Sequence, residues 1–168
     1  MYKRIIIFSF SFILILYMTP ISHAFTLLTR EQALKDVFPS GVEYETETVE
    51  LDGETLERVK ERLDGNLVFV QEGSESPPVE KIDEYEFIFA KKGDKRIGVA
   101  LIEVQPGKWG PVKFIVAMDL KPTVRQVRVM SYEEKRGRPI ARMSFLRQYR
   151  GKTTDNPLKV GSDIYGIS

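Results

Sequence analysis

Hydrophobic and polar positions alternate with a period of two through much of the second half of the chain, as they do in antiparallel strands. Four runs have this alternation or a nearly continuous apolar stretch, and each is bounded by turn-forming residues: 85–90, 97–104, 112–118 and 123–130. The connections between them are short. The pattern therefore predicts four consecutive strands that form an antiparallel meander.

Other segments have the spacing of short amphipathic helices. Thr29 and Gln32 form a capping box at the start of one helix. Apolar residues three and four positions apart predict further helices over residues 54–63 and 140–149, and residues 42–51 look extended. Together the elements predict an α+β fold, in which an antiparallel sheet of about four strands has helices packed on it.

The first 24 residues have the pattern of an export signal. A basic start precedes an apolar run over residues 5–18, and Ser22-His23-Ala24 has the small-x-small form of a cleavage site. A signal peptide over residues 1–24 predicts a periplasmic or other extracytoplasmic protein. The apolar run is shorter than the roughly 20 residues that a bilayer span needs, and a retained membrane anchor is the alternative.

Composition divides the remaining chain into two predicted parts. Residues 25–78 form a helical and extended lead, which ends in the low-complexity stretch QEGSESPP at 71–78. A short apolar run at 67–70 predicts one more strand within this lead. Residues 79–168 contain the predicted sheet and form the main domain.

Charge and composition exclude several classes of function. The net charge is +1 at pH 7, which argues against a nucleic-acid partner, and there is no Cys. The one histidine, His23, lies in the predicted signal peptide, so the mature domain cannot supply a Ser-His-Asp or Cys-His hydrolase. A Ser-Lys hydrolase is disfavoured because pairs such as Lys159 and Ser162 lie in a glycine-bearing tail rather than on a helix.

Three loops hold candidate chemistry. Trp109 stands between glycines in residues 106–111, where it either stacks on a flat ligand ring or covers the sheet edge. The charged loop 133–138 is either a solvated surface or a phosphate contact through Arg136 or Arg138. The third is the tail over residues 160–168, to which composition alone assigns no function.

The tail resembles the beginning of a known flavin-attachment signature. Asp163 and Ser168 match the D and S of the pattern D-x-x-x-x-S-G-A-T found in FMN-binding domain proteins. In that family, which includes the periplasmic C subunit of the sodium-translocating NADH:quinone reductase and the G subunit of Rnf complexes, a flavin transferase joins FMN through its phosphate to the Thr hydroxyl.

Three upstream segments add to the resemblance, in the family's order and at suitable spacing. Residues 145–152 (FLRQYRGK) are similar to F-L-x-Q-F-x-G-K, and residues 110–119 are similar to the strand G-G-P-I-x-x-x-V-x-x-D. Residues 134–137 (EKRG) stand where the family often has E-T-P-G beside the flavin. The resemblance covers roughly residues 95–168.

The resemblance implies an FMN-binding-domain-like fold and an electron-transfer flavoprotein rather than a hydrolase. It implies FMN as the cofactor, with no metal, and partners that are a membrane electron-transfer complex or quinone and cytochrome carriers, together with a flavin transferase. The residues expected at the cofactor are Trp109, Gly110, Glu134, Arg136, Gly137, Asp163 and Ser168.

The chain also departs from the family pattern. Gly, Ala and the acceptor Thr would be the three residues after Ser168, so covalent attachment maps onto no residue of this chain. The sequence is therefore expected to be a fragment, or else a relative that has lost its flavin. Lys135-Arg136 also replaces the usual T-P. The alternative function is a cofactor-free periplasmic α+β binding or interaction module.

Overall fold

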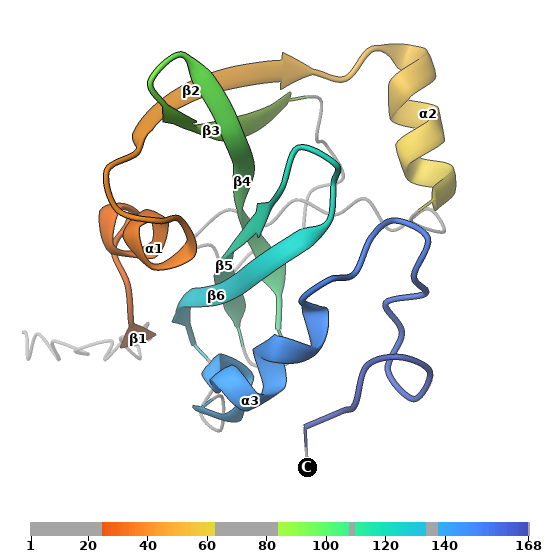
Figure 1. The fold of residues 1–168 in the computed structure, drawn as a ribbon. Helices are drawn as coiled ribbons and strands as arrows, with labels where there is room; N and C mark the ends of the chain where they lie inside the picture. The colour runs from red at the N-terminus through yellow and green to blue at the C-terminus, as the bar shows by residue number, and fades with distance from the viewer. Residues whose placement is uncertain (1–24, 63–83, 108–109, 134–137, 168) are drawn as a thin grey trace, which may run out of the picture.

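The computed structural model describes residues 25–62, 84–107, 110–133 and 138–167. These residues form one six-stranded antiparallel sheet in the order β1-β6-β5-β4-β3-β2 (Figure 1). The strands are β1 (Phe25–Thr26), β2 (Glu43–Glu50), β3 (Glu84–Lys92), β4 (Lys95–Pro106), β5 (Pro111–Met118) and β6 (Val124–Tyr132). The helical segments are α1 (Arg30–Val37), α2 (Gly53–Arg62), η1 (Arg138–Ala141), α3 (Met143–Leu146) and η2 (Arg147–Tyr149).

The expected fold of about four strands with packed helices is wrong, because the sheet has six strands and the helices are short. The four predicted strands are present as β3 to β6. The two additional strands come from the segment before residue 63: β2 pairs with β3 along its whole length, and β1 pairs with the end of β6. Thus the predicted N-terminal lead contributes both edges of the same sheet.

The polar sequence of β2 explains why its pairing was missed. The strand reads EYETETVE, and none of its residues is buried. Edge strands are commonly charged, which limits pairing with other chains. Here the charges also make local contacts, since Glu45 and Glu47 form ion pairs with Arg96, and Glu45 with Lys91.

The predicted helix over residues 140–149 is also wrong as a single element. The structure divides it into η1, the four-residue α3 and η2. The interruption lies at Arg142, whose φ of −68° and ψ of 132° are extended rather than helical. The first helix is confirmed at Arg30–Val37, and α2 confirms the predicted helix over its described residues.

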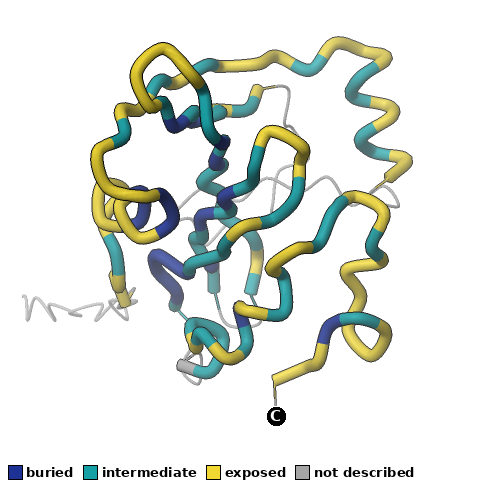
Figure 2. The backbone as a smooth tube through the Cα atoms, in the orientation of Figure 1, coloured by how far each residue is buried: buried dark blue, intermediate teal, exposed yellow. Residues whose placement is uncertain are grey.

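The larger hydrophobic core lies between α1 and one face of the sheet (Figure 2). Its helical side consists of Ala33, Leu34 and Val37, with Phe38 just after the helix. The residues of the sheet in this cluster are Ile88, Ala90, Ala100, Ile115, Ala117 and Met130. Small alanines on the strands let the short helix approach the sheet closely, and Ile88 and Ile115 fill the space that remains.

A second, smaller cluster joins the opposite face of the sheet to the C-terminal helical segments. Val112, Val129 and Tyr132 pack with Leu146 of α3. Since successive strand residues point to opposite faces, Phe114 belongs to this side and Ile115 to the α1 side. This cluster fixes η1 and α3 on the sheet, and thereby helps to position the segment that follows them.

Several sequence predictions lie outside the described residues. They are the signal peptide at 1–24, the strand at 67–70, the loop at 71–78 and the domain boundary after residue 78. In the parts of the chain that the structure describes, no helix combines the length and apolarity needed to cross a membrane.

Replacing Thr29 by alanine is expected to lower the free energy of unfolding by about 1 kcal/mol. The Thr29 hydroxyl accepts a hydrogen bond from the backbone N–H of Gln32, and the Gln32 side chain accepts one from the N–H of Thr29. Urea unfolding measures the change. Thr29→Ser keeps the cap and serves as the control; an equal loss in both variants would contradict the capping role.

Candidate functional site at the C-terminal tail

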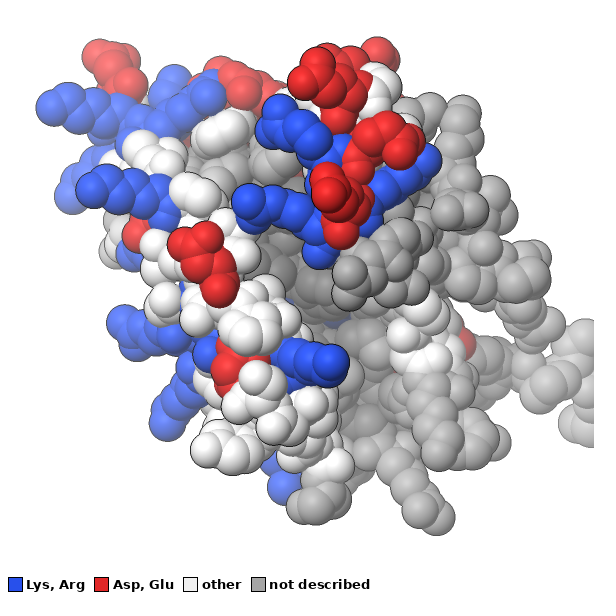
Figure 3. Space-filling view, turned by 90° about the vertical axis from the view of Figure 1, so that its right-hand side faces the viewer, with Lys and Arg blue, Asp and Glu red and all other residues white. Residues whose placement is uncertain are grey.

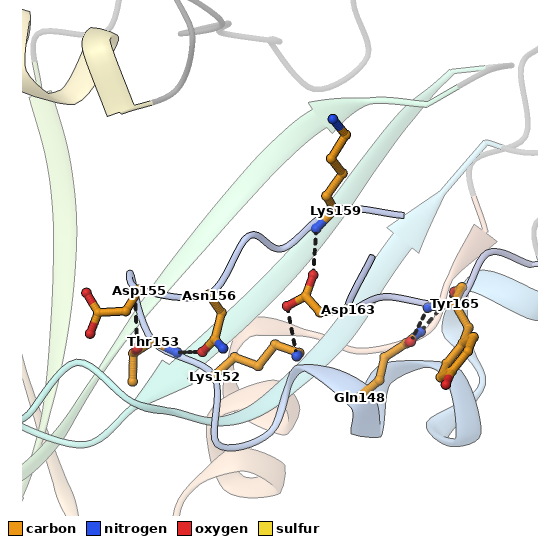
Figure 4. Close-up of polar contacts among 8 residues, drawn as sticks. All are labelled: Gln148, Lys152, Thr153, Asp155, Asn156, Lys159, Asp163 and Tyr165. Atoms are coloured by element: carbon orange, nitrogen blue, oxygen red, sulfur yellow. Dashed lines mark hydrogen bonds and ion pairs between the residues drawn. The ribbon is translucent and has the colours of Figure 1, made fainter. Parts of the chain in front are cut away.

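An ion pair fixes the beginning of the tail (Figure 4). Lys152 Nζ lies 2.9 Å from Asp163 Oδ2, and the two side chains are only 17% and 19% exposed. The other carboxylate oxygen of Asp163 accepts a hydrogen bond of 2.9 Å from the backbone N–H of Lys159. The hydrogen bond from Lys152 is the main reason that the pKa of Asp163 is lowered from its ordinary value.

The side chain of Gln148 holds the tail two residues further on. The backbone N–H of Tyr165 donates to Gln148 Oε1 at 2.7 Å, and Gln148 Nε2 donates to the Tyr165 carbonyl at 3.2 Å. The primary amide thus pairs with both backbone groups of one residue, as a neighbouring strand would do. Figure 4 shows this contact beside the Lys152–Asp163 pair.

Burial of Ile164 completes the attachment of the tail to the domain. Ile164 is 2% exposed, whereas Tyr165 next to it is 84% exposed. The segment that supplies Gln148 and Lys152 is itself fixed to the sheet by two backbone hydrogen bonds to Val124. The N–H of Val124 donates to the Lys152 carbonyl at 2.8 Å, and the N–H of Gly151 donates to the Val124 carbonyl at 2.7 Å. The tail is therefore held by a part of the fold that is anchored to β6.

A pocket of about 310 Å³ lies between this tail and the helical segments. The residues that line it are Pro139, Arg142, Ser144, Phe145, Gln148, Tyr165, Gly166 and Ile167. Phe145 and Tyr165 supply aromatic rings, Arg142 supplies a cation, and Ser144 and Gln148 supply polar groups. Such a lining suits a planar ligand with polar or anionic substituents.

The predicted site residues do not all come together. Gly110 lies against Glu133, since a Cβ atom on Gly110 would be 2.6 Å from the Glu133 Cβ. The β4–β5 connection therefore contacts the start of the charged loop, at the end of β6. Asp163 lies elsewhere, because its partner Lys152 is hydrogen-bonded through its backbone to Val124 at the beginning of β6. The structure does not join Asp163 to Gly110.

The other predicted site residues lie outside the described part of the chain; they are Trp109, Glu134, Arg136, Gly137 and Ser168. The structure also places at the tail three residues that are not among the predicted site residues: Arg142, Gln148 and Lys152. One sequence signal for two of them was available: Gln148 and Lys152 are polar residues four positions apart within the motif FLRQYRGK.

A carboxylate on the sheet, away from the pocket, has an altered titration. Burial of Glu103 on β4 raises the pKa of its carboxyl. Burial raises the pKa of Tyr85 as well, and the charge of Glu103 raises it further. Residues with shifted pKa values often occur at functional sites. However, neither Glu103 nor Tyr85 is among the residues that line the pocket beside the tail.

The substitution Glu103→Gln is expected to stabilise the domain at neutral pH and to have little effect near pH 4. Because the pKa of Glu103 is higher in the folded protein, the unfolded chain loses this proton first as pH rises above its own pKa of about 4.3. The fold therefore becomes less stable until pH passes the folded-state pKa, and the loss of stability stays constant at higher pH. The difference in urea midpoint between variant and parent across this range measures the effect. A constant difference at every pH would contradict the burial of a charge.

The substitution Asp163→Asn is expected to flatten the acid limb of the stability curve. Because the folded-state pKa is lowered, the ionised carboxylate stabilises the fold above its unfolded pKa of about 3.9, and this contribution disappears as pH falls through the folded value. Urea midpoints between about pH 2 and pH 5 test this. Asp155→Asn, at an exposed position of the same segment, is the control and should keep the parent curve.

Comparison of the sequence with models of protein families and with curated proteins gives no match in either case.

Proposed function

We propose that the chain is an exported flavin-carrying domain that serves membrane-associated electron transfer, with FMN attached just beyond Ser168. The observation that carries the proposal is a contact between two separate parts of the sequence resemblance. Gln148 and Lys152 belong to the motif FLRQYRGK, and they bind Tyr165 and Asp163 of the motif DIYGIS. The resemblance was based on matching residues and on their order and spacing in the sequence, so physical contact between the motifs is a separate support.

The pocket beside the tail has a chemistry compatible with a flavin. Phe145 and Tyr165 offer surfaces for the isoalloxazine ring, and Arg142 offers N–H donors to its carbonyl groups or to the phosphate. The tail over residues 165–167 forms one wall, so a flavin linked soon after Ser168 would lie close to this pocket.

In this proposal the protein residues position the cofactor and the flavin supplies the redox chemistry. Lys152 and Gln148 hold the tail in one conformation, which limits where an attached group can move. Phe145 and Tyr165 exclude water from one side of the ring, and Arg142 stabilises negative charge near it. Neither His nor Cys is needed for this role, which agrees with a mature domain that contains neither.

Attachment is tested by expressing the chain with Gly-Ala-Thr added after Ser168, together with a flavin transferase. The extended protein should show flavin fluorescence after denaturation and electrophoresis. Gln148→Ala and Lys152→Ala should reduce this fluorescence several-fold, while Arg58→Ala, on the exposed helix α2, should leave it unchanged. A folded, soluble and non-fluorescent extended protein would refute the proposal and would favour the cofactor-free interaction module.

A further inference from the structure

The tail exposes an unusual number of apolar side chains for a short segment. Nine large hydrophobic residues are exposed in the described parts of the chain, and four of them are in the tail or just before it: Leu158, Val160, Tyr165 and Ile167, at 48%, 67%, 84% and 44%. Val160 lies close to the end of the tail, because its Cγ1 is 3.4 Å from the position that a Cβ atom would take on Gly166, between Tyr165 and Ile167. Clustered exposed apolar residues usually mark an interaction site.

The same part of the chain also has exposed cations. Arg142 lines the same pocket as Tyr165 and Ile167, and Arg147 is adjacent to Gln148, which binds Tyr165. Lys159 stands between Leu158 and Val160, and Figure 4 shows its side chain pointing away from Asp163. Arg142, Arg147, Arg150 and Lys159 are all exposed, and none forms an ion pair with another residue that the structure describes.

Charge is distributed unequally between two segments of the chain. Residues 138–167 contain six basic and two acidic residues, whereas residues 43–62 contain eight acidic and three basic ones. Figure 1 shows β2 and α2 at the top of the molecule and the end of the tail at the bottom. In Figure 3, Lys and Arg side chains alternate with uncharged atoms along the lower left of the molecule.

We propose that residues 142–167 form a docking surface for an anionic lipid bilayer. The combination of unpaired cations with exposed Leu, Val, Ile and Tyr suits the interface of a membrane, where cations bind phosphate headgroups and apolar or Tyr side chains enter the boundary below them. The excess of acidic residues from β2 to α2 is repelled by the same surface, although Lys91 and Arg96 offset part of it through their ion pairs with Glu45 and Glu47. The remaining asymmetry favours an orientation with the tail toward the lipid. This inference does not depend on a bound flavin.

Vesicle sedimentation with the full chain tests the proposal. The protein should bind vesicles of equal parts phosphatidylcholine and phosphatidylglycerol more tightly than vesicles of phosphatidylcholine alone. The triple substitution Arg142→Gln, Arg147→Gln, Arg150→Gln should weaken binding to the anionic vesicles on the order of a hundredfold, at about fivefold for each cation near the surface. The substitutions Leu158→Ser and Val160→Ser should weaken binding to the same vesicles without changing the net charge.

The control is a second triple substitution that removes the same number of positive charges. Arg58→Gln, Lys92→Gln and Lys95→Gln remove exposed cations from α2 and the β3–β4 turn, and this variant should stay within about threefold of the parent because screening limits distant charges. Residues 1–24 are present in every variant, so their own affinity for lipid cancels. Far-UV circular dichroism and urea midpoints establish that each variant is folded.

Three outcomes would overturn the proposal. The first is equal binding to neutral and anionic vesicles, and the second is an equal loss in the two triple variants. The third is binding to poly-glutamate without binding to anionic vesicles, which would assign the surface to an acidic protein partner instead.

Discussion

Replacing Ile115 by alanine should lower the free energy of unfolding by about 2–5 kcal/mol. Ile115 is fully buried on β5, in the core between α1 and the sheet. The substitution removes three heavy atoms from a closely packed position, so the loss combines the transfer free energy of the side chain with the cost of a cavity. Since domains are typically stable by about 5–15 kcal/mol, this single change consumes a large share of the total.

Urea unfolding of the parent, Ile115→Ala and Ile115→Val measures this effect. The valine variant should lose about 0.5–1.5 kcal/mol, because it removes one methyl group. The slope of the free energy with urea should be the same in all three proteins, as the surface exposed on unfolding hardly changes. A loss below about 1 kcal/mol for the alanine variant would mean that this core is loosely packed or differently arranged.

The substitution Gly98→Ala should destabilise the domain by about 1–3 kcal/mol. Gly98 is buried on β4, where an added Cβ would lie 2.8 Å from the Met118 carbonyl oxygen and 2.9 Å from Phe38 Cε1. The carbonyl belongs to the neighbouring strand and cannot move without disturbing the β4–β5 pairing. Phe38 would have to shift away from the core formed with α1.

The matched control for Gly98 is Gly53→Ala at the start of α2. A Cβ at Gly53 meets no other atom within 4 Å, and its backbone has no positive φ. Thermal unfolding should therefore show a lower Tm for Gly98→Ala and an unchanged or slightly higher Tm for Gly53→Ala. Equal Tm values for the two variants would contradict the close approach of β5 and Phe38 to Gly98.

The four strands from β3 to β6 were predictable because alternation and turn residues are local signals. Paired edge strands are harder to recognise, since four of the eight residues of β2 are Glu and β1 has only two residues. Their place in the sheet depends on partners that are distant in sequence: Phe25 pairs with Tyr132, and Glu50 with Glu84. Similarly, the chain is extended at Arg142, where the sequence has neither glycine nor proline, and α3 after it packs on the sheet through Leu146.

The candidate site was predictable only in part. The importance of Asp163 followed from a sequence pattern, but its fixation depends on Lys152, eleven residues earlier, and on the turn that brings the tail back. Gln148 mimics a neighbouring strand for Tyr165, and no periodicity along the chain indicates such a contact. The pocket formed with Arg142 and Phe145 is likewise a product of tertiary structure.

We propose above all that FMN is covalently attached just beyond Ser168, next to this tail. The most direct test of this claim is the intact mass of the chain extended by Gly-Ala-Thr and co-expressed with a flavin transferase, followed by peptide mapping. We predict a mass increase equal to FMN less one water, located on the peptide that contains the added threonine, and its loss when that threonine is replaced by alanine. An unchanged mass in a folded protein, beside a transferase that modifies an established acceptor in the same cells, would contradict the claim.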